Sequence, residues 1–470
     1  MKNWYRILIL FLVSSSLLTF TAAAQQKNTD TERALVLKLA AYLKDSSYIK
    51  NTIRQIETEK KVDTQITGYQ KLHKQVQRML LLQSELKWLN MEAIRLAYED
   101  MKRIEGFDAV KCLPILTELE QQVKQGFGNI YSGDEAVLAN AEKAVANKRA
   151  ILLANPLLNG DKILTVRYQL GNRDRRAMAP ELGTQSNNWS NQESARRKGF
   201  NADIVELSNL RDEVQIRTIY KPDNTSSIAD LKLHWDGDRA MFTQTMSDNR
   251  WNVFEVKLNN GDCKKLIDNP EPDLEFYDGT YLPDGRIIAN SNIGYQGVPC
   301  VNGSDPVGNM VLYTPQSKNL RRLTFDQDAN WNPVIMNNGR VMYTRWEYTD
   351  LTHYYTRIVM NMNPDGTEQK ALYGSGSMFP NSTFDVQPLP GYASAFVGII
   401  SGHHGVARSG RLILFDPAKA RKGAAGMLQE IPHRNRPIVE EVKDRLVDGV
   451  WPQFIKPSPL NDTCLLYTSP

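Results

Sequence analysis

Residues 280–289 read Thr-Tyr-Leu-Pro-Asp-Gly-Arg-Ile-Ile-Ala, which is typical of a strand, a tight turn and a second strand. Asp-Gly supplies the positive φ angles that a short hairpin turn needs, and apolar residues flank it on both sides. The pattern recurs around Gly237, Gly339 and, more weakly, Gly391. The four turn glycines are 48, 54 and 52 residues apart. A repeat of hairpins at this spacing predicts the blades of a β-propeller.

A second pair of strands follows each hairpin. After the Gly285 hairpin, for example, Asn309–Tyr313 is apolar and leads to a further strand near Arg322. One blade cannot bury both of its faces alone, so consecutive blades must stack. The predicted blades cover residues 162–222, 228–270, 274–325, 329–373 and 383–432, and a sixth opens near Gly449.

The region before the repeat has a helical rather than an alternating pattern. Its apolar residues recur at the 3.6-residue period, and Gly106 and Gly128 mark breaks. Asn155-Pro156 and Asn159-Gly160-Asp161 then mark a domain boundary. We therefore expect an α plus all-β multidomain chain, with a helical hairpin or bundle at 25–153 and a propeller at 160–462. The expected helical runs are Thr31–Lys61, Tyr69–Ile104, Pro114–Phe127 and Asp134–Leu153.

The two ends of the chain predict processing and a cloning scar rather than structure. Residues 1–24 have the pattern of a cleavable signal peptide: Lys2 and Arg6, an uncharged stretch at 7–20, and an Ala-x-Ala site ending at Ala24. This predicts a periplasmic or secreted protein with no membrane span after cleavage. Residues 464–470 resemble a translated sequencing adapter, so we expect the propeller to be C-terminally truncated within a longer parent protein.

Composition excludes several classes of protein. The chain is 41% hydrophobic and 23% charged, which is ordinary for a globular protein. Lys and Arg number 57 against 53 Asp and Glu, a balance that gives no indication of a nucleic-acid partner. The four cysteines are too few for a disulfide-built scaffold.

The repeat resembles TolB-like propellers and, more closely, the middle domain of the hydrazine synthase alpha subunit. The resemblance rests on the stretch Asn332–Tyr348, on Gly297-Val298-Pro299-Cys300 and on His403-His404-Gly405. It implies a six-bladed propeller over residues 160–462. Hydrazine synthase alpha subunits carry c-type haem, which needs a C-x-x-C-H motif. No such motif is present, so no cofactor is evident here, and haem c or a metal ion is left to the full-length protein.

Several candidate site residues lie in the expected loops. Arg345, Trp346, Glu347 and Tyr348, with Arg408, are candidates for ligand binding, since arginine and aromatic faces bind ligands together; a blade-packing network is the alternative. Cys300, His403 and His404 are candidate metal ligands, with an inter-blade hydrogen-bonding loop as the alternative for the histidine pair and a Cys263–Cys300 disulfide or simple burial as the alternatives for Cys300. The loop carboxylates that are considered for calcium are Asp273, Asp278, Asp326 and Asp328, although no complete D-x-D-x-D-G loop is present.

These observations predict a binding scaffold with an unknown protein or small-molecule partner. No G-x-S-x-G, P-loop or H-E-x-x-H motif indicates a catalytic site. Two alternatives stay open. One is the front part of a haem-dependent oxidoreductase similar to hydrazine synthase, and the other is a carbohydrate-active propeller, which requires a pair of acidic residues at its centre.

Overall fold

A computed structural model describes most of the chain in two compact units. One unit contains the residues up to Lys162 together with Ser208–Gln215, and the other contains Ile163–Leu207 and the residues from Ile216 onward. Residues 1–21 of the predicted signal sequence and most of the polar stretch 171–198 fall outside the described residues. The structure describes residues 22–87, 89–158, 162–169, 195, 197–199, 201–211, 213–223, 225–348, 356–403, 408–432, 436–450, 452–460 and 465–468.

The first unit contains six described helices, where the sequence predicted four runs. The expected run 31–61 is two helices, because the chain turns after Ala40. The run 69–104 is also two helices, and Asn90 caps the second by accepting a hydrogen bond from the Ala93 N–H at 3.0 Å. The helices are α1 (Ala22–Ala40), α2 (Ser47–Glu57), α3 (Val62–Lys87), α4 (Met91–Met101), α5 (Ala109–Gln125) and α6 (Glu135–Leu153).

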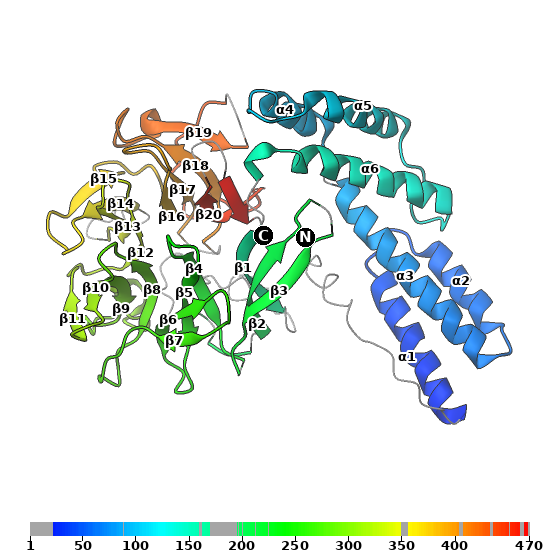
Figure 1. Cartoon of the computed structure of the whole chain (residues 1–470), viewed down its shortest axis with the longest axis horizontal. Helices are drawn as coiled ribbons and strands as arrows, with labels where there is room; N and C mark the ends of the chain where they lie inside the picture. Colours follow the sequence, from blue (N-terminus) through cyan, green and yellow to red (C-terminus); the bar gives the residue numbers. More distant parts are fainter. Residues whose placement is uncertain are drawn as a thin grey trace. The chain divides into compact units, whose positions relative to one another are not determined.

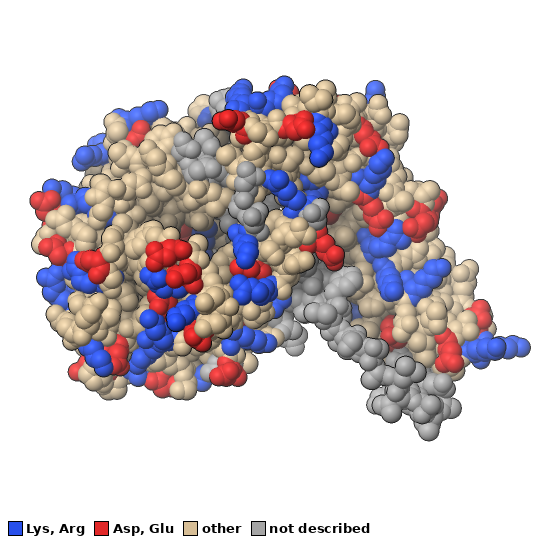
Figure 2. Space-filling view, viewed as in Figure 1, with Lys and Arg blue, Asp and Glu red and all other residues tan. Residues whose placement is uncertain are grey.

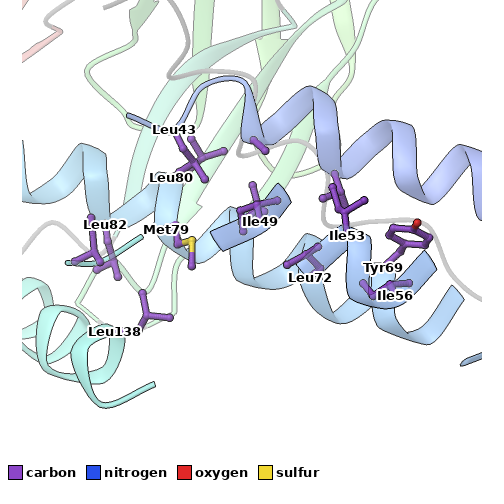
Figure 3. Close-up of a cluster of buried hydrophobic side chains, with 14 of the residues drawn as sticks. Leu43, Ile49, Ile53, Ile56, Tyr69, Leu72, Met79, Leu80, Leu82 and Leu138 are labelled. Atoms are coloured by element: carbon purple, nitrogen blue, oxygen red, sulfur yellow. The ribbon is translucent and has the colours of Figure 1, made fainter. Parts of the chain in front are cut away.

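These helices share two apolar cores, so the unit is not a hairpin. Figure 3 shows the first core, where Ile49 and Ile53 of α2 face Leu72 and Met79 of α3. The second core lies between α4, α5 and the later part of α6. Helix α6 contributes Leu138 to the first core and Ile151 to the second. One helix therefore holds both layers together.

The second unit is a β-propeller (Figure 1). Its first blade has three strands, β1 (Lys162–Gln169), β2 (Asn201–Ser208) and β3 (Gln215–Tyr220). Four blades of four antiparallel strands follow. They are β4 (Ile228–Leu233), β5 (Arg239–Thr245), β6 (Trp251–Lys257) and β7 (Cys263–Lys265); β8 (Phe276–Tyr281), β9 (Ile287–Ser291), β10 (Asn309–Thr314) and β11 (Asn319–Arg322); β12 (Asn330–Ile335), β13 (Val341–Trp346), β14 (Arg357–Met362) and β15 (Lys370–Tyr373); and β16 (Thr383–Pro388), β17 (Phe396–Ile400), β18 (Arg411–Phe415) and β19 (Met427–Ile431).

The expected count of six blades is corrected to five. After β19 the described residues contain only a two-stranded sheet, β20 (Ile455–Pro459) with β21 (Leu465–Thr468). β20 lies beside β16, and Figure 1 shows β4, β8, β12, β16 and β20 around a common centre. The third and fourth strands that complete each of the four preceding blades are not present among the described residues of this sheet.

The blades stack through apolar side chains. Between the fourth and fifth blades, Tyr373, Phe396 and Phe415 form one aromatic group, with the Phe396 and Phe415 rings stacked at 4.7 Å. Between the third and fourth blades, Met310 and Leu312 meet Tyr343 and Met360. This packing supports the strand alternation that the sequence predicted.

Charges of both signs are interspersed over the surface that Figure 2 shows. The net charge of the whole chain is +4. No helix of the described residues is long and apolar enough to span a membrane.

Candidate functional site: the loop face and the propeller centre

The long loops of the propeller gather at one end. In an antiparallel blade, the connections between the first and second strands lie at one end of the sheet, and those between the second and third strands lie at the other. The four turn glycines are at the first end. The residues between the second and third strands, 292–308, 347–356 and 401–410, are at the other end, which we call the loop face. Among the described residues, the predicted Arg345, Trp346, Glu347, Tyr348, His403 and Arg408 lie on or next to these loops.

An aromatic and arginine cluster lies just inside the loop face. Trp331 packs against Trp346 at 6.3 Å and against Phe384 at 5.8 Å between ring centroids. The Arg408 guanidinium lies over Trp331 and Phe384, at 4.6 and 4.9 Å, and Arg357 lies over Trp346 at 4.4 Å. All five side chains are buried. The structure therefore brings the predicted Trp346 and Arg408 together, with Tyr348 packed on Trp346 at 5.3 Å.

His403 belongs to this buried cluster. Its Nδ1 lies 2.7 Å from the Arg357 Nη1, which donates to it, and its ring lies 5.6 Å from that of Trp346. An arginine donor occupies the Nδ1 lone pair, so His403 does not offer Nδ1 to a metal ion. His404 lies outside the described residues, and so does the Cys300 side chain, although the segment beside it reaches the cluster through Val298.

Arg345 and Glu347 lie on the opposite side of their strand from Trp346. The Arg345 guanidinium pairs with the Glu347 carboxylate and lies 3.6 Å from Asp326 Oδ1. The predicted stretch 345–348 is therefore divided between two environments. Trp346 is in the buried cluster, and Arg345 and Glu347 are at a partly exposed seam between the third and fourth blades.

The described cysteines do not fit a c-type haem site. Cys112 is buried in the second helical core, and Cys263 is a free thiol in β7, so the Cys263–Cys300 disulfide is not formed. Burial raises the pKa of Cys263 to about 11. Two cysteines and a histidine in one motif are needed for haem attachment, and neither residue has a cysteine neighbour of that kind.

A second polar group, which the sequence did not predict, lies at the propeller centre. Each of five successive inner strands has one β-bulge, and each bulge holds one residue with a left-handed backbone. Asp and Asn tolerate this conformation better than most residues. We call these five residues the axial ring: Asp230, Asp278, Asn332, Asp385 and Lys456, with φ angles of 52°, 51°, 54°, 48° and 45°.

Hydrogen bonds connect the axial ring from blade to blade. The Asn332 backbone N–H donates to Asp278 Oδ2 at 2.6 Å, and the Asp385 N–H donates to Asn332 Oδ1 at 3.2 Å. The Lys456 N–H donates to Asp385 Oδ2 at 3.3 Å. The Lys456 ammonium then lies 3.5 Å from Asp230 Oδ1. The side chains of Asp278, Asn332 and Asp385 thus each hold the backbone of the next inner strand, and the Lys456 side chain contacts the Asp230 carboxylate.

The charges at the ring balance. Lys232 donates to Asp278 Oδ1 at 3.2 Å and to the Pro333 carbonyl at 3.0 Å. Burial raises the pKa values of Asp278 and Asp385. Burial lowers the pKa of Arg408 to about 10, against the opposing effect of Asp385. Lys232, Lys456 and Arg408 therefore face Asp230, Asp278 and Asp385, three cations against three carboxylates.

The ring keeps contact with solvent although it lies at the centre of the blades. Lys456 exposes 38% of its side chain, Lys232 21% and Asp230 13%. The face of the propeller in Figure 2 is hollowed at this centre. Arg408 and the tryptophans are buried, so the loop-face cluster covers one side of the ring.

One regularity in the sequence could have indicated the ring. Asp230, Asp278 and Asn332 each precede a turn glycine by seven residues, and Asp385 precedes Gly391 by six. The fixed distance from the turn glycine is the signal, because the inner strands contain other polar residues as well, such as Lys232 in β4 and Asn330 in β12. Lys456 lacks a described turn glycine after it, so only the structure places it in the ring.

A third polar group lies on the β4–β5 turn. His234, Asp236 and Asp238 approach one another closely enough to hold a metal ion. The Arg239 guanidinium already lies among them, with contacts of 2.9 Å to both carboxylates and 2.7 Å to His234 Nε2. The Arg239 guanidinium supplies the positive charge that a metal ion would bring, so we propose no metal site at this turn.

Comparison with known proteins finds distant likenesses to solved structures. The sequence matches no protein-family model and no curated protein. Among solved structures, the chain is similar to hydrazine synthase from Kuenenia stuttgartiensis (TM-score 0.46, 10% identity, 66% of this chain and 42% of that chain). It is also similar to TolB from Acinetobacter baumannii (0.37, 10%, 64% and 59%) and to a putative TolB from Agrobacterium tumefaciens (0.36, 15%, 53% and 80%). The chain thus spans less than two thirds of the first two structures.

Proposed function

We propose that this chain is an exported binding propeller that takes a zwitterionic ligand, such as a peptide end, at the axial ring. The observation that carries the proposal is the pair formed by Asp230 and Lys456. The pair is long, at 3.5 Å, and Lys456 keeps more than a third of its side chain exposed. Asp230 Oδ2 is buried and accepts no hydrogen bond among the described residues.

An ion-pair exchange explains how such a ligand is bound. A ligand ammonium that replaces the Lys456 ammonium beside Asp230 supplies the donor that Oδ2 lacks. Lys456 is then free to bind the ligand carboxylate, and Lys232 lies near the same ring. Charge-assisted hydrogen bonds of this kind are worth more than neutral ones. A ligand with both charges is therefore favoured over one with a single charge, because no ring charge is left unpaired.

A carbohydrate-active function is less well supported. It requires two carboxyl groups on either side of a sugar bond. Asp278 and Asp385 are such a pair by residue type, and burial raises both pKa values. Asn332 lies between them, donating its N–H to Asp278 and its side-chain amide to Asp385 at 3.3 Å. This residue occupies the position that a substrate would need, so we favour binding.

A further part of the proposal concerns the whole protein. The pattern of residues 1–24 supports export to the periplasm or beyond the cell.

Calorimetric titration of the full chain tests the proposed ligand class. Three probes differ only in charge: glycylglycine, N-acetylglycylglycine without the ammonium, and glycylglycinamide without the carboxylate. We expect glycylglycine to bind at least about fivefold more tightly than either capped form, because about 1 kcal/mol per lost charge pair corresponds to this ratio. Equal affinities for the three probes, or no heat from any of them, would refute the proposal.

A further inference from the structure

Asp230 differs from the other carboxylates of the axial ring in the partners that it has. Asp278 and Asp385 each accept a hydrogen bond from the backbone N–H of the next inner strand. The N–H of Asp278, in the strand after that of Asp230, donates to Thr243 Oγ1 at 3.0 Å instead. Asp230 Oδ2 is buried and accepts no hydrogen bond among the described residues, and Oδ1 lies 3.5 Å from the Lys456 ammonium. The Asp230 carboxylate is therefore available to a donor on a ligand.

The first blade brings a tyrosine hydroxyl close to this carboxylate. Leu164, Val166 and Tyr168 are alternate residues of β1, and all three pack on the core between the first and second blades. The Tyr168 hydroxyl donates to the Ile228 carbonyl at 2.5 Å, and Ile228 precedes Asp230 by two residues in β4. Tyr168 thus holds the beginning of the strand that carries Asp230.

The two charges of the Asp230–Lys456 pair both act on this hydroxyl. Burial raises the pKa of Tyr168 to about 12, while the Lys456 charge opposes the rise and the Asp230 charge adds to it. The hydroxyl therefore lies near both charges and keeps its proton at neutral pH. That proton is donated to the Ile228 carbonyl, and a tyrosine oxygen can accept hydrogen bonds at the same time.

We propose that Asp230 and Tyr168 form the ammonium subsite of the axial ring and that this subsite selects a primary ammonium. A primary ammonium has three N–H donors. One donates to Asp230 Oδ2, a second donates to the Tyr168 hydroxyl oxygen, and the third is left to water. An ammonium whose nitrogen carries three methyl groups has the same charge but no N–H for these acceptors. The subsite therefore distinguishes ammonium groups of equal charge.

This inference rests on the proposed zwitterionic ligand and narrows its class. A carboxylate alone attracts any cation, whereas hydrogen bonds require donors in the right direction. Asp230 supplies the charge, and Tyr168 adds a second acceptor on a different strand. A peptide with a free, unmethylated amino end then fits the site better than a quaternary ammonium compound such as a betaine.

Two dipeptides of equal charge test the subsite by calorimetric titration of the full chain. Glycylglycine has a primary ammonium, and N,N,N-trimethylglycylglycine has a quaternary one. We expect the wild type to bind glycylglycine at least about tenfold more tightly, because two hydrogen bonds are lost with the methylated form. Tyr168→Phe removes only the hydroxyl, so it should weaken glycylglycine about fivefold and change the affinity for the trimethyl form by less than about twofold.

Tyr373→Phe is the matched control for the loss of a buried hydroxyl. The Tyr373 hydroxyl also donates to a backbone carbonyl, that of Gly423, at 2.5 Å, and burial raises its pKa to about 12 as well. It lies on β15, the fourth strand of its blade, and packs between the fourth and fifth blades. This variant should bind both dipeptides like the wild type.

The possible results separate the subsite from the proposed function. The subsite is overturned if Tyr168→Phe binds glycylglycine like the wild type, if it weakens both dipeptides equally, or if Tyr373→Phe causes the same loss. In each of these cases the wild type still binds glycylglycine, so the proposed function stands. If the wild type does not bind glycylglycine, both the subsite and the proposed function are overturned.

Discussion

Asn332 donates its backbone N–H to Asp278 Oδ2 at 2.6 Å, which joins the inner strands of the third and fourth blades. The same carboxylate accepts from the Asn290 side chain at 3.2 Å and from Lys232. Asp278 therefore has donors from three successive blades. The left-handed backbone at Asp278 and at Asn332 directs both residues to the centre of the propeller. The β-bulges that contain them therefore make the hydrogen bond between the two strands possible.

Replacement of Asp278 should destabilise the propeller strongly. Asp278→Ala leaves the Lys232 ammonium and two amide donors without their acceptor in a buried setting. We expect a loss of about 3–5 kcal/mol in the free energy of unfolding, as for other broken buried ion pairs. Urea unfolding measures it. Asp284→Ala, on the exposed turn of the same blade, should cost less than about 0.5 kcal/mol; equal losses would contradict a bridging role for Asp278.

Gly279, next to the ring, should not tolerate a side chain. A Cβ there would lie 2.6 Å from Met241 Sδ and 2.9 Å from Val253 Cγ1, both in the preceding blade. We expect Gly279→Ala to cost about 1–3 kcal/mol through overpacking. The double variant Gly279→Ala/Met241→Ala should lose less free energy of unfolding than the sum of the two single variants, because Met241 is one source of the clash. Additive losses in urea unfolding would argue against this contact.

The buried Asp328 should make stability depend on pH. Its folded-state pKa, about 6, lies above the unfolded value near 4, so the folded state holds the proton more tightly. The stabilisation by that proton is present below about pH 4 and is lost as the pH rises through 6. The stability of Asp328→Asn relative to the wild type should therefore rise by about 2 kcal/mol between pH 4 and pH 7. Parallel stability curves for the two proteins would disprove the raised pKa.

Arg408 should not be replaceable by lysine. Its planar guanidinium stacks on Trp331 and Phe384, and an ammonium group is more strongly hydrated and cannot stack in the same way. We expect Arg408→Lys to lose about 1–2 kcal/mol, measured by urea unfolding. Arg286→Lys, on the β8–β9 turn, is the matched control and should change stability by less than about 0.5 kcal/mol.

The repeat could be predicted from the sequence because hairpin turns are local. The pair Asp284-Gly285 determines the geometry of its own turn. The alternation of apolar and polar residues on either side then indicates the two strands. The expected ranges 228–270, 274–325, 329–373 and 383–432 contain the strands of the four complete blades. The helix boundaries were harder. The break before Asn90 depends on a side-chain cap rather than on Gly or Pro, so the run 69–104 was expected as one helix.

The ring could not be predicted because it depends on distant contacts. Asp230 and Lys456 meet only when the last inner strand comes beside the others. The fixed distance from the turn glycine marks four of the five ring residues, but it does not show that their side chains meet at the centre. Trp346 and Arg408 were expected as site residues from their types alone, and the structure shows that stacking buries both. Asp326 and Asp328 were considered for calcium from their types, and among the described residues the structure brings no third carboxylate, histidine or cysteine close enough to share a metal ion with them.

Calorimetric titration of two lysine variants with glycylglycine tests the central claim most directly. Lys456→Met removes the ring ammonium, whereas Lys318→Met changes another left-handed lysine that pairs with an aspartate, Asp268, on the surface. We expect Lys456→Met to bind about tenfold more weakly and no longer to distinguish glycylglycine from glycylglycinamide, while Lys318→Met binds like the wild type. Wild-type affinity and discrimination in Lys456→Met would contradict a ligand site at the axial ring.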